Sequence, residues 1–342
     1  MKTYEEVFTF ENLYISYLKS RRGKRNNFSC NNFEINALEY TENLYDSIIN
    51  DKYNIGKYRE FKVYEPKERL IMALPFQDRV VQHCLCDFYL EELLEPKLIY
   101  DNCANRKDKG THFGLNRLKL FMGEHYRKYN NKGYFLKMDI SKYFYSINKE
   151  ILKNMLSPYI KDKKLNKMIN EIIDSTKGEV GIPIGNQSSQ WFAIFYMSGL
   201  DHFIKEKLKI KHYVRYMDDM VIIHKDKEYL KFCLSEITNY LDTKLDLKLN
   251  NKTQIFPIKN GVDFLGFHLY ITETGKVIKK LRRSSKSNMK RKMKRYKKMY
   301  KKGVITKENI KNSYNSWVAH ASNGNNYHLI QHMNKYYNDI FL

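Results

Sequence analysis

Two adjacent acids in the middle of an apolar run constrain this chain more than any other feature of its sequence. Asp218 and Asp219 interrupt the run HYVRYMDDMVIIH at residues 212–224, and a third acid, Asp139, lies near the end of the apolar run YFLKMDI at 134–140. The β-branched and aromatic content predicts a strand at 134–140 and two short strands around a turn at 212–224. Carboxylates brought together in apolar surroundings are unfavourable unless a cation compensates their charge.

The acids have two readings. A single Asp in a turn is explained by ordinary turn chemistry, because its side chain bonds nearby backbone. That explanation weakens for two adjacent acids framed by strands, with a third on another strand. Carboxylate oxygens suit hard divalent cations, and Mg²⁺ needs few of them because it keeps water and substrate phosphates. Two ions about 3.5–4 Å apart can activate an attacking oxygen and stabilise a leaving one in phosphoryl transfer.

The charge of the chain indicates a polyanionic partner. The 342 residues include 61 Lys and Arg against 38 Asp and Glu, for a net charge of +23. Abundant Lys, Asn, Ile and Tyr are typical of an AT-rich genome, so part of the excess has a compositional explanation. Residues 276–302, however, contain fifteen Lys and Arg and no acid. Clustering of this kind favours nucleic-acid binding over codon bias.

Other features exclude several classes of protein. A hydrophobic content of 42% provides enough apolar surface for a folded chain of two or three domains. No apolar run approaches the 18 or so residues that span a bilayer, and the acidic N-terminus does not resemble a targeting peptide. The five cysteines show neither a CxxC pair nor zinc spacing. We therefore expect a cytoplasmic protein with reduced thiols and no membrane partner.

Periodicity predicts strands interrupted by long helices, which is typical of an α+β fold rather than a regular parallel α/β repeat. We expect a β-hairpin over residues 58–76 and strands at 134–140, 253–258 and 262–271, besides the acidic hairpin. Helical spacing of apolar residues predicts helices at 1–20, 36–50, 78–95, 113–130, from about 148, and at 188–208, 227–245 and beyond 283.

Six segments, in order, resemble the motifs of reverse transcriptases. YMDD at 216–219 resembles the YxDD box, and FLKMDISKYF at 135–144 resembles the first palm motif, in which an aromatic residue follows the aspartate by five positions. The other four are EPKERLIMALPFQDRVVQH (65–83), GIPIGNQSSQ (181–190), LNNKTQI (249–255) and GVDFLGFHLY (261–270), of which the last resembles the primer grip. YxDD alone would be a weak signal, whereas six motifs in family order are specific.

The resemblance implies the right-hand polymerase fold of fingers, palm and thumb, with an antiparallel palm sheet and a helical thumb. We expect an N-terminal helical extension at 1–57, fingers at 58–133, a palm with interleaved helices at 134–271 and a basic thumb at 272–342.

By the same resemblance, Asp139 and Asp218 would hold two Mg²⁺ ions, with the Ile140 carbonyl as a further ligand and Asp219 in support; Mn²⁺ is expected to substitute. Lys252 matches a family lysine proposed to protonate pyrophosphate, with a solvated turn lysine as the alternative. In this reading the protein mainly positions the primer 3′-hydroxyl and the triphosphate and neutralises charge.

The resemblance also assigns residues to the incoming nucleotide. Phe144 matches the steric gate that excludes a 2′-hydroxyl, although a core aromatic is the alternative; as a gate it favours DNA over RNA synthesis. Arg69 matches the arginine that lies against the triphosphate. Further nucleotide-binding candidates are Lys67, Ile184, Gly185, Gln190 and Arg79, for which a helical salt bridge is the alternative.

Basic residues near both ends are expected to bind nucleic acid without regard to its sequence. Met289, Met293, Tyr296 and Tyr300 recur at helical spacing, so one face of this segment is expected to pack on the thumb while its cations meet phosphates. The candidates are Arg21, Arg22, Arg282, Arg283, Lys290, Arg291, Lys294, Arg295 and Lys298.

Within the family, the chain is most similar to the enzymes of diversity-generating retroelements. It lacks the common QG…SP pattern and carries the IGxxxSQ variant at Ile184–Gln190, and the segments 100–112 and 316–325 also resemble that group. Membership would imply error-prone copying of a structured template RNA into cDNA from dNTPs, with a basic accessory protein or a homo-oligomer as further partner.

Three other readings stay open. The enzyme could be a bacterial antiphage reverse transcriptase that makes cDNA or repetitive DNA from a noncoding RNA. It could be an inactive RNA-binding protein with a polymerase fold, although the intact Asp139, Asp218 and Asp219 argue against this. An RNA polymerase is disfavoured by Phe144.

Overall fold

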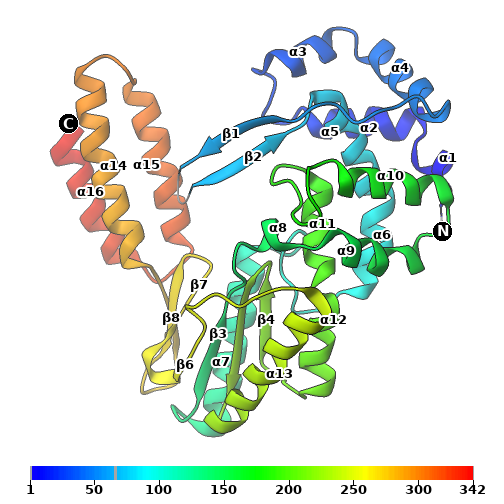
Figure 1. The fold of residues 1–342 in the computed structure, drawn as a ribbon. Coiled ribbons are helices and arrows are strands. Elements are labelled where there is room, and N and C mark those ends of the chain that lie inside the picture. Colours follow the sequence, from blue (N-terminus) through cyan, green and yellow to red (C-terminus); the bar gives the residue numbers. More distant parts are fainter. Residues whose placement is uncertain (1, 65–67, 342) are drawn as a thin grey trace.

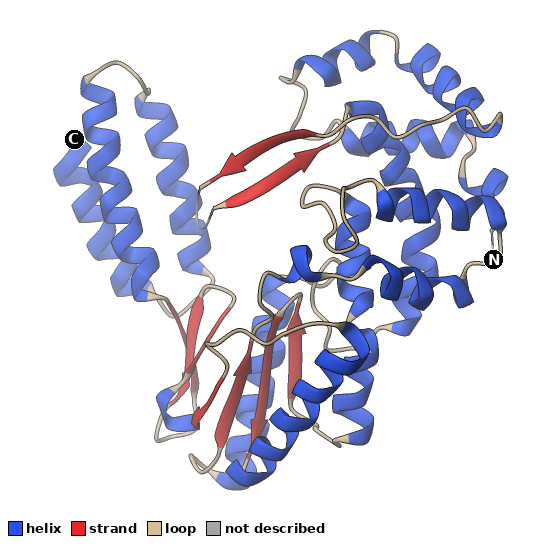
Figure 2. Ribbon diagram, viewed as in Figure 1, coloured by secondary structure: helices blue, strands red, loops and turns tan. Residues whose placement is uncertain are grey.

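The computed structural model describes residues 2–64 and 68–341, whose elements form a helical N-terminal region, a central sheet with its helices, and a separate helical bundle (Figure 1). A long two-stranded hairpin extends from the N-terminal side toward the bundle. The strands form sheets of two, four and three strands, and helices surround the four-stranded sheet (Figure 2). The α+β, right-hand arrangement expected for this chain is confirmed.

The N-terminal region begins with a broken helix. The single helix predicted at 1–20 is divided because the Thr9 hydroxyl accepts a hydrogen bond from the backbone N–H of Asn12, which starts a second helix. The helix predicted at 36–50 is confirmed as α4, whereas α3 was not predicted. The four helices are α1 (Tyr4–Val7), α2 (Phe10–Ser20), α3 (Phe28–Ile35) and α4 (Ala37–Ile49).

The predicted hairpin is confirmed by β1 (Arg59–Val63), which pairs antiparallel with β2 (Arg69–Ala73). After the hairpin the chain enters α5, which packs on α2 and so joins the hairpin to the N-terminal helices. The helices that follow are α5 (Phe76–Leu85), a π-helical turn (Cys86–Leu90), α6 (Glu91–Leu94) and α7 (Thr111–Tyr129).

The central sheet has the order β4-β5-β3-β6, and every neighbouring pair is antiparallel. Its strands are β3 (Tyr134–Met138), β4 (Tyr213–Tyr216), β5 (Asp219–His224) and β6 (Gln254–Pro257). Successive side chains point to opposite faces of a strand. Leu136 and Met138 accordingly join one apolar cluster while Phe135 joins a second, so the sheet separates two hydrophobic cores.

Helices cover the first of these cores. The long helix predicted at 188–208 is present as two α-helices and a π-helical turn (Phe203–Lys207). Its first part is buried on nearly every side, so the segment is a core helix rather than an amphipathic one. The α-helices between and after the sheet strands are α8 (Tyr143–Ser146), α9 (Lys149–Leu156), α10 (Lys163–Asp174), α11 (Gln187–Tyr196), α12 (Ser198–His202) and α13 (Lys227–Leu245).

A three-stranded sheet connects the central sheet to the bundle. The strand predicted at 262–271 is a hairpin, because the chain turns at Leu265 and Gly266, whose φ angles are 46° and 88°. A further strand pairs with β8, so the helical bundle begins only at Arg283. These elements are β7 (Val262–Phe264), β8 (Phe267–Ile271), β9 (Val277–Leu281), α14 (Arg283–Lys301), α15 (Lys307–Ser322) and α16 (Tyr327–Phe341).

All five cysteines are buried and free. Among the described residues, no helix combines the length and the apolar character that a bilayer crossing requires.

Candidate active site

The register of β3 and β5 places Asp139 opposite Asp219 at one end of the four-stranded sheet, one position beyond the last paired residues. Met138 pairs with Met220 in the antiparallel register of β3 and β5, so the next facing positions are Asp139 and Asp219. Facing Cα atoms in such a pair lie about 5 Å apart. Asp218 occupies the turn that joins β4 to β5, and all three acids are half-buried. Residues distant in the sequence thus bring three carboxylates to one end of the sheet.

The turn that carries Asp218 has an unusual backbone. Tyr216 pairs with Asp219, which leaves Met217 and Asp218 as its two central residues. The φ angle of Met217 is 53°, in the left-handed region that residues other than glycine rarely adopt. Hairpin turns with positive φ at the first central position usually place glycine there. Strained conformations of this kind persist only when surrounding contacts hold them.

The backbone of Ile140 is oriented toward the acids. Ile140 forms an antiparallel bridge with Leu249, and its neighbours make the bonds of that bridge. The Asp139 carbonyl accepts from the N–H of Asn250 at 2.7 Å, and the Ser141 N–H donates across the bridge at 2.9 Å. In this pattern the carbonyl of Ile140 points away from the bridge, toward the side occupied by β5.

Lys137 places a buried cation among the acids. It lies on the same face of β3 as Asp139, and its ammonium contacts the Asp219 carboxylate. The Lys137 side chain is only 18% exposed, and its Nζ lies 4.9 Å from the centre of the Phe264 ring. Burial lowers the pKa of Lys137 to about 7, against the opposing influence of the Asp139 charge. Below pH 7, where Lys137 is mainly protonated, its ammonium balances the charge of Asp219 from within the protein.

The oxygen atoms at this end of the sheet fit hard divalent cations. Within residues 2–64 and 68–341, no three His, Cys, Asp or Glu side chains form a ready-made metal cage. The Oδ1 atom of Asp219 is nevertheless buried, with the ammonium of Lys137 against it. Three carboxylates and one carbonyl are the donor types that Mg²⁺ takes, and Mg²⁺ usually completes its shell with water and substrate phosphates. The residues present therefore fit the expected ions.

The expected fingers residues lie in different surroundings. Arg69 begins β2, where it pairs with Val63 and is exposed. Lys67 falls outside the described residues. Arg79, on α5, donates from its Nε atom to the Leu74 carbonyl at 2.9 Å, so it braces the start of its own helix.

Phe144 lies beside the loop at residues 181–185. It follows Asp139 on the short helix α8, and its carbonyl accepts a hydrogen bond from the Ile182 N–H at 2.9 Å. The ring is half-buried, 5.9 Å from the ring of buried Tyr143, and packs on the edge of the first apolar cluster. Both readings of Phe144 are compatible with this position, because one part of the ring packs and another part is accessible.

The 181–185 loop also contacts the hairpin of β1 and β2. The Ile184 carbonyl accepts from the N–H of Met72 at 2.9 Å. Gly185 has a φ of 138°, and a Cβ atom there would lie 2.6 Å from the Met72 carbonyl oxygen, so the contact requires glycine. Gln190 is exposed on α11, one turn beyond this loop. The hairpin that carries Arg69 is thereby joined to the loop that carries Ile184.

Lys252 lies in an exposed turn beside Asp139. Its backbone N–H donates to the Asn250 side chain at 3.0 Å, and Asn250 in turn bonds the Asp139 backbone. The turn leads into β6, which pairs with β3. Lys252 is therefore close in topology to the acids, with its side chain exposed.

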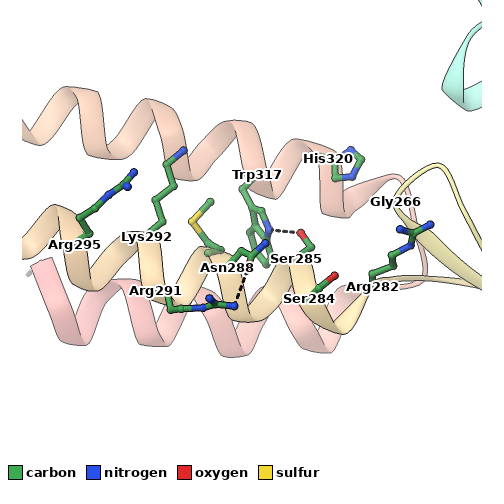
Figure 3. Close-up of a pocket in the computed structure, with 11 residues that line it drawn as sticks. Gly266, Arg282, Ser284, Ser285, Asn288, Arg291, Lys292, Arg295, Trp317 and His320 are labelled. Atoms are coloured by element: carbon green, nitrogen blue, oxygen red, sulfur yellow. Dashed lines mark hydrogen bonds between the residues drawn. The ribbon is translucent and has the colours of Figure 1, made fainter. Parts of the chain in front are cut away.

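A basic groove of about 830 Å³ runs between α14, α15 and the β7–β8 turn. Figure 3 shows Arg282 near Gly266 at one end, with Lys292 and Arg295 toward the other. Trp317 lies between them and donates to Ser285 at 3.1 Å. The groove residues are Gly266, Arg282, Ser284, Ser285, Asn288, Met289, Arg291, Lys292, Arg295, Trp317 and His320.

The basic residues predicted to bind nucleic acid separate into groups. Arg282, Arg291 and Arg295 line the groove, whereas exposed Arg283, Lys294 and Lys298 are outside its lining. Lys290 faces α16, with its Nζ atom 3.2 Å from the His332 Nε2 atom and 4.7 Å from the centre of the Tyr336 ring.

The apolar stripe predicted on α14 is shorter than expected. Met289 and Met293 are buried and Tyr296 is half-buried, but Tyr300 is 39% exposed. The stripe therefore ends before Tyr300, because the packing of α15 and α16 covers only the first part of that helix face.

The N-terminal basic loop contributes less free charge than expected. Arg21 pairs with Glu34 at 2.5 Å and bonds the Tyr17 hydroxyl at 3.1 Å, so its guanidinium is occupied within the fold. Arg22 is exposed.

Sequence reasoning missed Lys137 and also Arg215 of β4, whose buried guanidinium pairs with the carboxylate of Asp201. A signal for Lys137 was present, because a residue two positions before Asp139 on a strand shares its face. Arg215 was detectable only as a charge inside an apolar strand, without any indication of its partner.

Comparison with known proteins gives the following matches. Residues 60–269 match the family model described as reverse transcriptase (RNA-dependent DNA polymerase). The putative COX1/OXI3 intron 2 protein of Saccharomyces cerevisiae is 23% identical over 286 residues, which cover 64% of this chain and 31% of that relative. The chain thus spans less than a third of the length of that curated relative.

Two solved telomerases are among the structures that the chain matches. A Candida albicans telomerase in complex with a TWJ fragment of telomeric RNA is 12% identical, with a TM-score of 0.49 over 69% of this chain and 50% of that one. An apo telomerase from Candida tropicalis, truncated from its C-terminal domain, is 16% identical, with a TM-score of 0.49 over 66% of this chain and 54% of that one.

Proposed function

This chain belongs to the reverse transcriptase (RNA-dependent DNA polymerase) family, and from that membership we propose that it copies an RNA template into cDNA at the end of the sheet where Asp139, Asp218 and Asp219 meet. The observation that carries the proposal is the facing pair Asp139 and Asp219, next to the Asp218 turn. Acids at one end of an antiparallel sheet, inside a region that matches the family, are the groups that nucleotidyl transfer needs.

In this proposal Asp139, Asp218 and the Ile140 carbonyl would hold two Mg²⁺ ions, with Asp219 in support. The ions would supply activation of the primer 3′-hydroxyl and charge neutralisation at the departing pyrophosphate. Mn²⁺ is the expected substitute. Lys252, exposed beside Asp139, would donate a proton to the pyrophosphate if its side chain turns toward the substrate.

The nucleotide would lie between the fingers hairpin and the 181–185 loop. Arg69, exposed at the start of β2, would contact the triphosphate, with Lys67 and Arg79 in lesser roles. The half-buried ring of Phe144 would lie under the sugar and select dNTPs, and Ile184, Gly185 and Gln190 would border the nascent base pair. The hydrogen bond between Met72 and Ile184 supports this arrangement, because it joins the two segments.

The product duplex would leave along the basic groove of α14 and α15. Arg282, Arg291 and Arg295 would contact phosphates in the groove, while Arg283, Lys290, Lys294 and Lys298 would extend the positive surface. Arg22 would hold template RNA, with Arg21 in a structural role because it pairs with Glu34. The division into an extension (1–57), fingers (58–133), palm (134–271) and thumb (272–342) is part of this proposal.

For the biological role, we propose mutagenic copying of a structured RNA, as in diversity-generating retroelements. The sequence IGxxxSQ at Ile184–Gln190 supports it, because its first and last residues border the proposed nucleotide site. A basic accessory protein or a homo-oligomer would complete the complex. Antiphage defence, with cDNA or repetitive DNA made from a noncoding RNA, is the second candidate, since it uses the same chemistry.

The experiment is primer extension on an RNA template with Mg²⁺ and either dNTPs or rNTPs, using the wild type and the Asp218→Ala variant. We expect dNTP incorporation by the wild type, and a loss of at least ~1,000-fold in the variant, because a metal ligand is removed. Equal incorporation by the two proteins would contradict the proposed site. Sequencing of RNA that co-purifies with the protein, and of the cDNA made from it, distinguishes the two biological roles.

A further inference from the structure

We propose that Arg215 is a positioning residue that holds the strained Met217 turn in the shape that presents Asp218 and Asp219. This inference rests on the proposed function, since it assigns those acids to catalysis. It adds a residue that has no place in the family motifs discussed above.

The guanidinium of Arg215 is fully buried and bonded through all three of its nitrogens. Its Nε and Nη2 atoms form a fork onto the two carboxylate oxygens of Asp201, at 2.7 and 2.6 Å. Its Nη1 atom donates to the Met217 carbonyl at 3.0 Å, and Nη2 also donates to the Ile194 carbonyl at 2.9 Å. Arg215 and Asp201 are both 0% exposed.

The Met217 bond reaches the strained position itself. The φ angle of Met217 is 53°. A residue other than glycine leaves this left-handed conformation unless surrounding contacts hold it there. A charge-assisted donor on the Met217 carbonyl fixes the peptide between Met217 and Asp218, and hence the direction in which the Asp218 side chain leaves the turn. Relaxation of that peptide would displace Asp218 from Asp139.

The base of the Arg215 side chain is itself fixed. Its backbone N–H donates to the Asp101 carbonyl at 3.1 Å, and its carbonyl accepts from the Cys103 N–H at 2.9 Å. On the opposite edge of β4, Arg215 pairs with Met220 of β5. The guanidinium therefore extends from a strand that is bonded on both edges.

The partners of Arg215 connect the turn to the nucleotide side of the site. Ile194 lies on α11, the helix that begins next to the 181–185 loop and carries Gln190, and Asp201 lies on the following helix α12. One guanidinium thus links the carboxylate hairpin to the helices behind the proposed nucleotide site. A displacement of α11 and a displacement of the turn are coupled through these bonds.

A role in stability alone would not require this geometry. Buried ion pairs are often replaced by apolar side chains of similar volume without loss of stability. The Tyr213 hydroxyl also donates to Asp201, at 2.7 Å. Arg215, Asp201 and Tyr213 could therefore be replaced together by such apolar side chains. What an apolar replacement would not supply is the donor to Met217.

Two variants test the inference without leaving a buried charge unpaired. Arg215→Lys keeps a cation beside Asp201 but cannot contact both Asp201 oxygens and Met217. The triple variant Arg215→Met, Asp201→Leu and Tyr213→Phe removes the ion pair entirely. The matched control is Arg106→Lys, because Arg106 is also buried and forms a fork onto a carboxylate, that of Glu95.

Four measurements are made: thermal melting, binding of Mn²⁺ by electron paramagnetic resonance, binding of the primer–template by fluorescence anisotropy, and the kinetics of dNTP incorporation (kcat and KM). For the folded Arg215→Lys protein and the triple variant we expect Mn²⁺ binding to weaken at least ~5-fold and kcat to fall at least ~10-fold. Binding of the primer–template should be unchanged, and Arg106→Lys should resemble the wild type in all four measurements.

A folded variant with wild-type Mn²⁺ binding and wild-type kcat would overturn the inference, as would an equal loss in Arg106→Lys. Should the triple variant fail to fold, Arg215→Lys decides the question. An inactive wild type would refute the proposed function instead, and the Mn²⁺ comparison would still test Arg215 separately.

Discussion

The ammonium of Lys137 lies against the carboxylate of Asp219, on the strand face that also carries Asp139. Burial lowers the pKa of Lys137 to about 7, so below pH 7 the side chain is mainly charged, and its ammonium lies where a metal ion would otherwise balance the acids. The protein therefore carries an internal counter-charge in its proposed active site. Divalent cations that bind there must compete with this ammonium for Asp219.

Replacing Lys137 by Met is expected to increase affinity for divalent cations. Unit charges about 5 Å apart interact by roughly 3 kcal/mol at an effective dielectric constant of 20, and solvent and side-chain rearrangement reduce that value, so we expect about ten-fold tighter Mn²⁺ binding. Electron paramagnetic resonance without nucleotide, at a pH about one unit below the Lys137 pKa of about 7, measures it. The matched control is Lys153→Met, because Lys153 is 19% exposed, close to the 18% of Lys137, and pairs with acids away from the sheet. Equal changes in both variants would refute the competition.

Phe144→Val is expected to relax discrimination against ribonucleotides. The half-buried ring borders the 181–185 loop, and its removal leaves room for a 2′-hydroxyl under the sugar. We expect the ratio of kcat/KM for dNTP over rNTP to fall at least ~10-fold, with dNTP incorporation within ~5-fold of the wild type. Phe144→Tyr is the control, since it keeps the ring and should keep the ratio. A wild-type ratio in Phe144→Val would assign this ring to the core alone.

Neutralising the groove should reduce the salt dependence of primer–template binding. Arg291 and Arg295 line the groove, and each phosphate contact contributes about one unit to the slope of log K against log salt. We expect Arg291→Gln with Arg295→Gln to lower the slope by roughly 2. Lys307→Gln with Lys311→Gln removes the same charge elsewhere on the bundle and should leave the slope within ~0.5. Fluorescence anisotropy between 50 and 300 mM salt, a range over which such slopes are resolved, provides the measurement.

The stability of the fold should decline in weak acid through His125. This ring is 1% exposed and bonds the Lys132 carbonyl at 2.8 Å. Burial lowers the pKa of His125 below its ordinary value of 6.5, and the nearby His224 contributes in the same direction. As pH falls below 6.5, the unfolded chain therefore takes up the proton first, and the free energy of unfolding decreases.

His125→Gln keeps a donor for Lys132 and does not titrate. We expect it to reduce the difference between the urea midpoints measured at pH 7.5 and pH 5.5, a range that spans the ordinary histidine pKa. Exposed His328→Gln should leave that difference as in the wild type. An unchanged difference in His125→Gln would show that other groups cause the acid sensitivity.

Much of the fold was predictable because its signals are local. The hairpin of β1 and β2, the acidic hairpin of β4 and β5, and helix α13 follow from alternation or helical spacing within a single segment. Where prediction was wrong, a local signal was overridden. The Thr9 cap divided the first helix, and the turn at Leu265 and Gly266 made a hairpin of one predicted strand.

The candidate site was predictable as a set of residues and not as an arrangement. Motif order assigned Asp139, Asp218 and Phe144 to one site. The sequence around Arg21, in contrast, did not indicate that its guanidinium forms an ion pair with Glu34. Nor did the run of cations on α14 reveal that Arg291 lines a groove while Lys290 turns toward α16. Which face of a basic helix is covered depends on the helices packed against it.

The sequence by itself determined the family, the three acids and the strands and turn that carry them, because these depend on residue type and short-range spacing. Only the tertiary structure decided that Asp139 faces Asp219, that Lys137 balances the charge between them, and that Arg215 holds the Met217 turn through Asp201 and Ile194. Each of these contacts joins segments distant in the chain. These contacts depend on the register of the strands, and that register is fixed because the two faces of the β4-β5-β3-β6 sheet pack against two separate apolar cores. No local sequence pattern specifies this packing.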